Sequence, residues 1–248
     1  MHDANFWTLF RNAAAKENCE LTARVNLDRP DEGIVATSTS APGRDFRLLG
    51  ISSSDTGGWP AKLIESYTRG NDMVTSYAGT DGWPFSPQIY WTGESIEVGG
   101  VAVHSLSIVV SIQTDRLDTH PEFVVRSSLP TEEVLRVSVA GEELLVDSHA
   151  DGPLQINPQA TACCQLWRLS GGELSYAEIM PRSDFRQLSV ERMDHSSTSR
   201  WELFSEFLEK GVIRRARLQA LFLPREDDVQ LAAECCQAIE RRPLPLTT

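Results

Sequence analysis

The sequence predicts a mainly β protein, built from antiparallel sheets in a large sandwich or a partly closed barrel, with one C-terminal helix. Three observations support this prediction. Apolar and polar residues alternate over many short segments, glycine-rich turns separate several of these segments, and helical spacing of apolar residues is clear in one segment near the end. Strand–helix–strand alternation is absent. An α+β fold is the alternative that these patterns leave open.

The first third of the chain is typical of short strands joined by turns. Residues 20–27 alternate Leu21, Ala23 and Val25 with polar neighbours. Further strands are expected at 33–40 and 45–52, around the turn-forming sequence APGRD. Residues 61–70 and 71–79 predict two more strands around a turn at 69–71, and residues 86–91 predict another that starts at the proline.

Three hairpins are expected in the middle of the chain. The clearest turns at Gly99-Gly100, because two glycines permit the positive φ values of a tight turn. Residues 105–115 and 122–130 predict largely buried strands. The second hairpin is expected to turn near Ala140-Gly141 and the third at Gly171-Gly172.

The C-terminal part combines a long strand with the expected helix. Residues 212–223 alternate Arg or Gln with Ala, Leu or Phe, which predicts a strand. The segment before it fits a strand or a helix, and the strand is favoured. Residues 224–242 predict a helix with an acidic first turn and an apolar stripe that packs on a sheet face. The stripe consists of Val229, Ala232, Ala233, Cys236 and Ile239.

Length and charge limit the class of protein. The chain has 248 residues, a net charge of −12 and a pI near 4.9. Such a surface repels phosphate backbones, so we expect no nucleic-acid partner, and RRAR at 214–217 would divide its arginines between two faces of a strand. No signal peptide or membrane-length apolar segment occurs, so a soluble cytoplasmic protein without membrane contact is expected. A protein partner cannot be read from the sequence.

Domain organisation follows from the same length. We expect one β-rich domain over residues 1–248, with two lobes joined near 147–160 as the alternative. That junction is a loop candidate because it contains two prolines and little periodicity.

The five cysteines predict no metal or disulfide framework. They are Cys19 and the adjacent pairs Cys163-Cys164 and Cys235-Cys236, and no CxxC or Cys/His ligand spacing occurs. We read them as reduced, mostly buried thiols. Phosphate-binding loops and nucleophile elbows are also absent, so no metal and no cofactor are expected.

Three residues are candidates for acid–base catalysis. His120 lies among carboxylates after a buried strand, Glu178 lies at a strand end, and Asp184 follows it in a turn. Acid–base chemistry needs two titratable groups in different environments, so His120/Glu178 or Glu178/Asp184 would form the pair. The alternative for each residue is structural: a hydrogen-bonded loop for His120 and a turn cap for Asp184.

Aromatic and polar residues between 59 and 91 are candidates for a ligand-binding surface. Sugar rings stack on aromatic faces, and neighbouring charged or amide groups bind their hydroxyl groups. The alternative is core packing, since Trp and Tyr are often buried. The candidate ligand-binding residues are Trp59, Tyr67, Arg69, Asp72, Tyr90 and Trp91.

Two resemblances accompany this interpretation. The stretches SYTRGNDMVTSYAGTDGWPFSPQIYW, LSYAEIMPRSDF and FLEKGVIRRARLQALFLPRED resemble a family of uncharacterised bacterial proteins of about this length, which has no assigned activity and implies no site residues. The antiparallel strands with scattered Trp, Glu and Arg are also similar to the supersandwich folds of sugar epimerases. That likeness implies a His/Glu pair, which no motif locates here.

Two functions are therefore carried forward. The first is a β-rich protein that binds a polar small molecule such as a sugar. The second is a metal-independent, epimerase-like enzyme acting on carbohydrate through a His/Glu or Glu/Asp pair.

Overall fold

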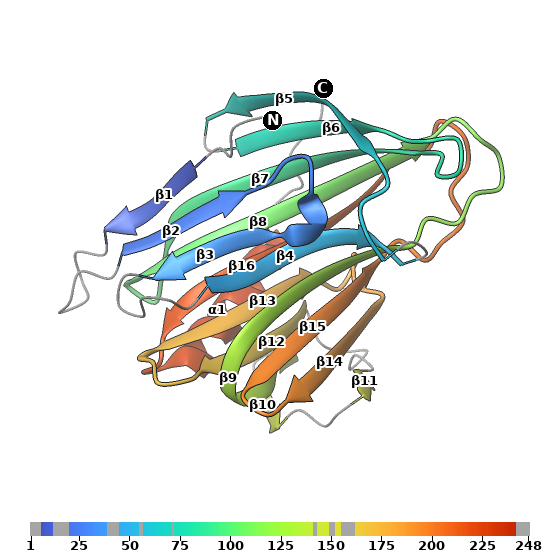
Figure 1. The fold of residues 1–248 in the computed structure, drawn as a ribbon. Coiled ribbons are helices and arrows are strands. Elements are labelled where there is room, and N and C mark those ends of the chain that lie inside the picture. Colours follow the sequence, from blue (N-terminus) through green and yellow to red (C-terminus); the bar gives the residue numbers. More distant parts are fainter. Residues whose placement is uncertain are drawn as a thin grey trace.

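The computed structural model describes residues 6–11, 20–38, 45–54, 57–70, 72–140, 143–148, 152–154 and 162–241. Within these ranges the protein is antiparallel β with one α-helix at its C-terminal end, as predicted. A short 3₁₀ helix, η1 (Pro30–Glu32), connects two of the early strands. Figure 1 shows the arrangement.

The described residues form 16 hydrogen-bonded strands. In chain order these are β1 (Phe6–Arg11), β2 (Glu20–Val25), β3 (Ile34–Ser38), β4 (Asp45–Ser53), β5 (Lys62–Arg69), β6 (Asp72–Ala78), β7 (Phe85–Val98), β8 (Val101–Thr114), β9 (Phe123–Ala140), β10 (Glu143–Ser148), β11 (Gly152–Leu154), β12 (Ala162–Leu169), β13 (Leu174–Pro181), β14 (Gln187–Met193), β15 (Ser196–Leu203) and β16 (Arg214–Pro224).

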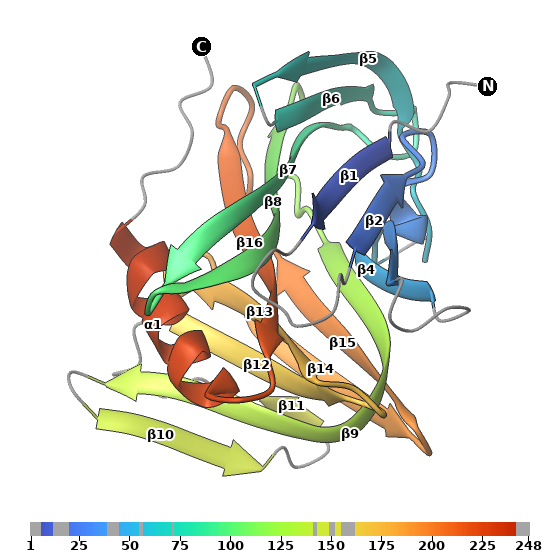
Figure 2. The same cartoon turned by 90° about the vertical axis from the view of Figure 1, so that its left-hand side faces the viewer.

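The strands build two sheets that share β9. The first sheet contains β1 to β4, the beginning of β9, β15, β14 and β11. The second runs from β10 through the end of β9 to β12, β13, β16, β8, β7, β6 and β5. Figure 2 shows β9 bending from one sheet into the other. Joined through β9, the strands form an antiparallel half-barrel, which agrees with the predicted large sandwich or partly closed barrel.

The inner faces of the two sheets enclose the main core. Its largest fully buried side chains include Trp91 and Tyr176 from the second sheet and Trp201, Phe123 and Leu48 from the first. Each sheet contributes alternate residues of its strands, so the polar residues between them point to the outer faces. The distinction between inner and outer face decides where every candidate site residue lies.

Two strands are longer than predicted. The sequence pattern placed a strand boundary at a proline in each, but both strands continue through it. Residues 122–130 and 133–140 join into β9, with Pro130 where the strand changes partners. Residues 86–91 and 94–98 join into β7, which begins at Phe85 rather than at Pro87. The backbone of Pro87 points towards β6, whose ladder with β7 stops at Gln88, so the missing N–H costs no ladder hydrogen bond.

The three expected hairpins are present as paired strands. β7 and β8 turn at Gly99-Gly100, and β12 and β13 turn at 170–173. β9 and β10 pair as expected, although Gly141 of that turn lies outside the described residues. The segment before residue 212 forms β15, a strand, which confirms the favoured reading. The proposed junction at 147–160 falls largely outside the described residues, so the two-lobe alternative stays a prediction.

The helix α1 (Asp228–Arg241) covers one half of the outer face of the second sheet. It packs on β9, β12, β13, β16 and the tip of β7, as Figure 2 shows. Its predicted stripe is confirmed: Ala232, Ala233, Cys236 and Ile239 are buried in a second hydrophobic cluster, and Val229 packs against it. The prediction that Pro224 opens the helix is wrong, because Pro224 pairs with Leu174 at the end of β16.

Three of the five cysteines, Cys164, Cys235 and Cys236, lie at the contact between α1 and β12, and Cys163 lies in the main core. Cys163, Cys164, Cys235 and Cys236 are buried free thiols, as expected, and Cys19 lies outside the described residues. The side chains of Cys164 and Cys236 are hydrogen-bonded to each other. Burial raises the pKa of Cys163 to about 12, so this thiol stays protonated at physiological pH.

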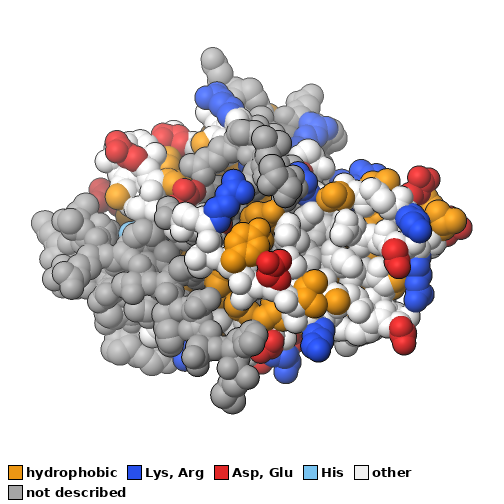
Figure 3. All heavy atoms as spheres, turned by 90° about the horizontal axis from the view of Figure 1, so that it is seen from above, with side chains coloured by type: hydrophobic (Ala, Val, Ile, Leu, Met, Phe, Trp, Pro, Cys, Tyr) orange, Lys and Arg blue, Asp and Glu red, His pale blue; other side chains and the backbone are white. Residues whose placement is uncertain are grey.

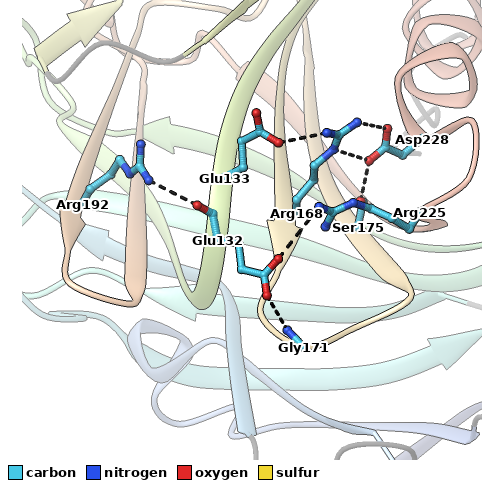
Figure 4. A network of polar contacts seen from close by, with 8 residues as sticks. All are labelled: Glu132, Glu133, Arg168, Gly171, Ser175, Arg192, Arg225 and Asp228. Carbon is cyan, nitrogen blue, oxygen red and sulfur yellow. Dashed lines mark hydrogen bonds and ion pairs between the residues drawn. The ribbon is translucent and has the colours of Figure 1, made fainter.

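A polar network anchors the first turn of α1 to the sheet (Figure 4). Arg168 on β12 donates to both carboxylate oxygens of Asp228 at 3.0 and 3.1 Å and to Glu133 at 2.9 Å. Ser175 on β13 donates to Asp228 at 2.6 Å. The Asp228 side chain is only 2% exposed, so these donors replace the water that the carboxylate loses on folding.

None of the helices in the described part of the chain is long and apolar enough to cross a membrane.

Candidate functional site

Polar and aromatic side chains gather on the half of the outer face that α1 does not cover. Residues opposite each other in adjacent antiparallel strands point to the same face, so the strand registers define rows across the sheet. The central row consists of Tyr67, Val74, Tyr90, Val109 and Arg217, from β5, β6, β7, β8 and β16.

Two flanking rows are more polar. One consists of Arg69, Asp72, Thr92, Ser107 and Gln219, and the other of Glu65, Ser76, Gln88, Ser111 and Arg215. We call nine residues of these rows the open face. It comprises Glu65, Tyr67, Arg69, Asp72, Ser76, Gln88, Tyr90, Thr92 and Arg215.

Hydrogen bonds order the side chains of the open face. The Tyr90 hydroxyl donates to Gln88 Oε1 at 2.9 Å, and Gln88 Nε2 donates to Ser76 Oγ at 3.1 Å. Thr92 Oγ1 donates to Asp72 Oδ1 at 2.6 Å. These bonds link β6 to β7, so the polar groups are held in place before any ligand arrives.

Charged groups from three strands converge around Tyr90. Burial raises the pKa of Tyr90, and the charges of Tyr67 and Asp72 raise it further, while Arg215 and Arg69 oppose the shift. The phenol is therefore a neutral hydroxyl at physiological pH. Arg69 and Arg215 come from strands that are far apart in sequence, yet both act on the same ring.

The two tyrosines differ in exposure. Tyr90 is 7% exposed and packs with Val74 and Val109 in a small hydrophobic cluster, whereas Tyr67 on the end strand is 43% exposed. Tyr90 thus belongs to the floor of the open face, and Tyr67 presents apolar ring surface to solvent. An exposed ring beside ordered polar groups is suited to stacking against a ligand.

Of the six residues predicted to bind a ligand, four lie on the open face: Tyr67, Arg69, Asp72 and Tyr90. The other two point to the opposite face. Trp91 is fully buried, and its indole N–H donates to Thr75 Oγ1 at 3.3 Å. Trp59 packs in the core against Tyr77, with ring centroids 4.9 Å apart. The expectation of one aromatic groove therefore fails for the tryptophans, because Trp91 follows Tyr90 directly and a strand alternates its faces.

Glu178 lies in the interior between the two sheets. Its carboxylate accepts hydrogen bonds from Ser127 Oγ and Tyr176 OH on one oxygen, the latter at 2.9 Å. The other oxygen accepts from Ser199 Oγ at 2.8 Å and from Trp201 Nε1 at 2.6 Å. These donors lie on β9, β13 and β15, so Glu178 cross-links the two sheets.

The donors that surround Glu178 are three hydroxyl groups and one indole N–H. Burial raises the pKa of the carboxyl group, while the hydrogen bonds from Ser127, Trp201, Ser199 and Tyr176 lower it. The side chain has no exposed surface. Ser127 also accepts the N–H of Leu49 at 2.9 Å, at an irregularity in β4 where Leu49 has a φ of +56°. We therefore describe this group as a structural cross-link.

The other two catalytic candidates lie elsewhere. His120 is an exposed loop residue whose ring lies 5.6 Å from that of Phe207. Asp184 lies in the turn after β13, where its carboxylate accepts the backbone N–H of Arg217 at 2.9 Å and the hydroxyl of Ser183 at 2.6 Å. The structure does not bring either residue to the enclosed carboxylate of Glu178.

Arg215 is the part of the open face that sequence reasoning missed. The expectation that the RRAR arginines divide between two faces is confirmed: Arg215 and Arg217 point outward, and Arg214 forms an ion pair with Glu206. The sequence signal for Arg215 was thus present. Its neighbours on β5 to β7 could be identified only from the pairing of β16 with β8.

Within the described residues no cluster of three or more His, Cys, Asp or Glu side chains could hold a metal ion. The open face itself carries two arginines, two carboxylates, an amide and hydroxyl groups. This set recognises hydroxyl, carboxylate and other hydrogen-bonding groups of an organic molecule.

Comparison with known proteins yields distant structural likeness alone. No protein-family model and no curated protein matches the chain. A proposed kojibiose phosphorylase from the human microbiome is 8% identical with a TM-score of 0.49, over 95% of this chain and 33% of that one. A proposed aldose 1-epimerase from Klebsiella pneumoniae is 8% identical with a TM-score of 0.45, over 97% of this chain and 89% of that one.

A third solved structure, a galactose mutarotase related enzyme from Lactobacillus acidophilus, is 9% identical with a TM-score of 0.41, over 89% of this chain and 98% of that one. The chain therefore spans about a third of the length of the first of these proteins. At such low similarity the function has to be argued from the residues of the open face.

Proposed function

We propose that this protein binds a small polar molecule with a ring, such as a sugar, on the open face. One observation carries the proposal: Tyr67, Arg69, Asp72, Tyr90 and Arg215 point to the same side of one sheet, although they come from four different strands. Aromatic surface supplies stacking, and charged side chains supply directional hydrogen bonds.

The dimensions of the open face suit a ligand of the size of a monosaccharide. Tyr67 and Tyr90 lie in one row, separated by β6, so their backbones are about 9–10 Å apart. Val74 lies between them and is buried. A sugar ring placed over Val74 would contact the ring of Tyr67, while Gln88 and Asp72 lie on either side within reach of its hydroxyl groups.

The open face carries charges of both signs, which suits a neutral sugar or a sugar with one acidic group. Arg69 and Arg215 both lie near Tyr90, and Asp72 is the carboxylate closest to that ring by its electrostatic effect. With Glu65, the open face has two guanidinium groups and two carboxylates, so its formal charge is neutral in a protein whose total charge is −12. Arginine binds carboxylate or phosphate oxygens in bidentate geometry.

The alternative, a metal-independent carbohydrate-active enzyme, has less support. It requires two of His120, Glu178 and Asp184 in one accessible cleft. Glu178 is enclosed between the sheets, and the carboxylate of Asp184 is used by the backbone of Arg217. Binding without turnover is therefore the function that we propose.

The test is a binding measurement with matched variants. Thermal-shift screening would use neutral monosaccharides, sugar acids and sugar phosphates, since a ligand at 100 times its Kd stabilises the fold by about 2.7 kcal/mol. Calorimetry of the best ligand would follow. Tyr67→Ala and Arg215→Gln are each expected to weaken binding at least tenfold.

The controls are an aromatic residue of similar exposure and an exposed arginine, both outside the open face. The exposed fraction of Phe207 is 39%, similar to the 43% of Tyr67. Arg192 lies on β14. Phe207→Ala and Arg192→Gln should bind as the wild type does. Equal losses in all four variants, or no binding by any sugar, would refute the proposal. A turnover of the bound sugar that is lost in Glu178→Gln would favour the enzyme instead.

A further inference from the structure

Strand β5 is an unpaired edge of the described sheet. It pairs with β6 on one side, and the strand order ends with it. Residues 64–69 are all exposed, with Ile64 at 64% and Tyr67 at 43%. Figure 3 views the molecule from the side where Figure 1 places β5, and hydrophobic side chains are exposed there among charges of both signs. An exposed edge of this kind offers its backbone to another strand.

The direction of the free backbone groups follows from two hairpins. Arg69 and Asp72 flank a two-residue turn, so they form a hydrogen-bonded pair. The alternation along β5 then points the N–H and C=O of Tyr67 towards β6 and those of Ser66 and Thr68 outward. The Val98–Val101 turn gives the same result independently. Hydrogen-bonded and non-hydrogen-bonded pairs alternate along the unbroken β7–β8 ladder from this turn, so the backbone groups of Trp91 point towards β6. Those of its partner Met73 therefore point towards β7.

Those outward groups allow an antiparallel pairing of β5 with a second copy of itself. Ser66 of one copy pairs with Thr68 of the other when the two-fold axis passes through Tyr67. In that register Glu65 lies opposite Arg69 of the other copy, twice by symmetry. The two Tyr67 side chains face each other in a non-hydrogen-bonded pair, where the Cα atoms are about 4.5 Å apart.

We propose that the protein forms a homodimer by pairing β5 with β5 in this register. The argument rests on charge complementarity: Glu65 and Arg69 lie on the same face as Tyr67, and the register converts them into two inter-chain ion pairs. Strand β10 is the contrasting edge, with exposed Leu144 and Val146. The corresponding register on β10 places Glu143 opposite Asp147, so like charges disfavour the same association there.

The dimer would join the second sheets of both copies into one continuous sheet, with their open faces adjacent. This dimer does not depend on the proposed ligand binding, because the two copies pair through the backbone of β5. About four inter-chain backbone hydrogen bonds form in so short a ladder. The contact is smaller than the roughly 1,600 Å² of a standard stable interface, so a reversible dimer at high protein concentration is expected.

Sedimentation equilibrium of the wild type and two charge variants tests the pairing. Glu65→Arg places two positive charges opposite each other, and Arg69→Glu places two negative charges opposite each other, so each variant alone should dimerise roughly tenfold more weakly. An equimolar mixture of the two variants should associate as well as the wild type, because opposite charges then meet. Lys62→Glu lies outside the paired stretch and serves as the control.

Cross-linking tests the register itself. Tyr67→Cys brings two thiols together at the two-fold axis, so mild oxidation with oxidised glutathione should give a covalent dimer. Thr68→Cys faces Ser66 and should not cross-link, and Arg215→Gln should leave dimerisation unchanged. The inference is overturned if the wild type is monomeric up to millimolar concentration, if the mixed charge variants fail to associate, or if Tyr67→Cys and Thr68→Cys cross-link equally.

Discussion

The two halves of the outer face of the second sheet differ in composition, although the same three strands run through both. Strands β7, β8 and β16 are apolar on this face where α1 covers them and mainly polar beyond the helix, with Tyr90 and Val109 in a small hydrophobic cluster. The covered half contains Ile96, Val98, Val101, Val103, Leu221 and Leu223. The open half contains Gln88, Tyr90, Ser111, Arg215 and Arg217.

The inner face of the same strands follows a different pattern. Behind the open half, Ile89, Trp91, Ile108, Val110 and Leu218 are fully or almost fully buried in the main core. Behind the covered half, the inner positions at the tips of β7 and β8 are exposed, at Ser95, Glu97 and Ala102. The apolar composition of the outer face therefore follows the cover that α1 supplies and not the burial of the inner face. The half of the outer face that α1 leaves uncovered is accessible to a ligand.

The largest effect is expected in the covered half. Leu221→Ala removes a fully buried side chain beneath α1 and should lower the free energy of unfolding by about 2–5 kcal/mol. Gln88→Ala in the open half should cost less than about 1 kcal/mol. Urea denaturation of both variants measures the contrast. Equal losses would show that the open half supports the fold as strongly as the covered half.

The second largest effect is expected at Asp228, which holds the first turn of α1 on the sheet. Asp228→Ala leaves Arg168 and Ser175 without their shared acceptor, so the free energy of unfolding should fall by about 2–3 kcal/mol. Glu133→Gln removes a half-exposed partner of Arg168 and should cost less than about 1 kcal/mol. Hydrogen exchange should show α1 losing protection in Asp228→Ala, and unchanged protection would contradict the anchoring role.

On the inner face, the buried carboxyl group of Glu178 should make the free energy of unfolding depend on pH. Burial raises the folded-state pKa of this carboxyl group above its unfolded value near 4.5, so the folded protein binds the extra proton between the two pKa values. Stability should therefore fall as pH rises through that window, with a slope of at most about 1.4 kcal/mol per pH unit. Above the folded pKa the loss is complete and the curve no longer depends on this group.

Glu178→Gln should remove that part of the pH dependence. The amide can donate to Ser127 and Tyr176, whose hydroxyl groups rotate, and accept from Ser199 and Trp201, so the hydrogen bonds are retained. The difference between the wild-type and variant stability curves isolates Glu178 from other titrating groups. A difference that does not vary with pH would show that the carboxyl group titrates normally.

The smallest effect on stability is expected for substitutions on the open face, the same substitutions that should weaken ligand binding most. Arg215→Gln and Tyr67→Ala should each change the free energy of unfolding by no more than about 0.5 kcal/mol, because neither side chain fills the core. Thermal unfolding at a protein concentration low enough to exclude dimers measures this. A loss of about 2 kcal/mol or more in either variant would make the open face a structural element.

Local patterns were sufficient for most of the fold. Alternation identified the strands around Val25, Ile108 and Leu218, and glycine pairs located the turns at 99–100 and 171–172. The stripe from Ala232 to Ile239 predicted the helix and its packing face. These features depend on neighbours in the chain, so their physical causes are present in a short window of sequence.

Proline was the main source of error in the element boundaries. Pro87 and Pro130 each suggested the limit of a strand, yet both lie inside longer strands. A proline interrupts a ladder only when its missing N–H faces a paired neighbour. The direction that each N–H faces depends on which strands pair and where their ladders end.

The sequence by itself determined the antiparallel β class, the single described helix and the residue types available for a site. Tertiary structure alone decided which of these residues meet. Tyr90 and Trp91 are adjacent in the chain but lie on opposite faces, while Tyr90 and Arg215 are far apart and share one face. Strand register and the position of α1 cause this division, and both are set by long-range packing that a local pattern does not contain.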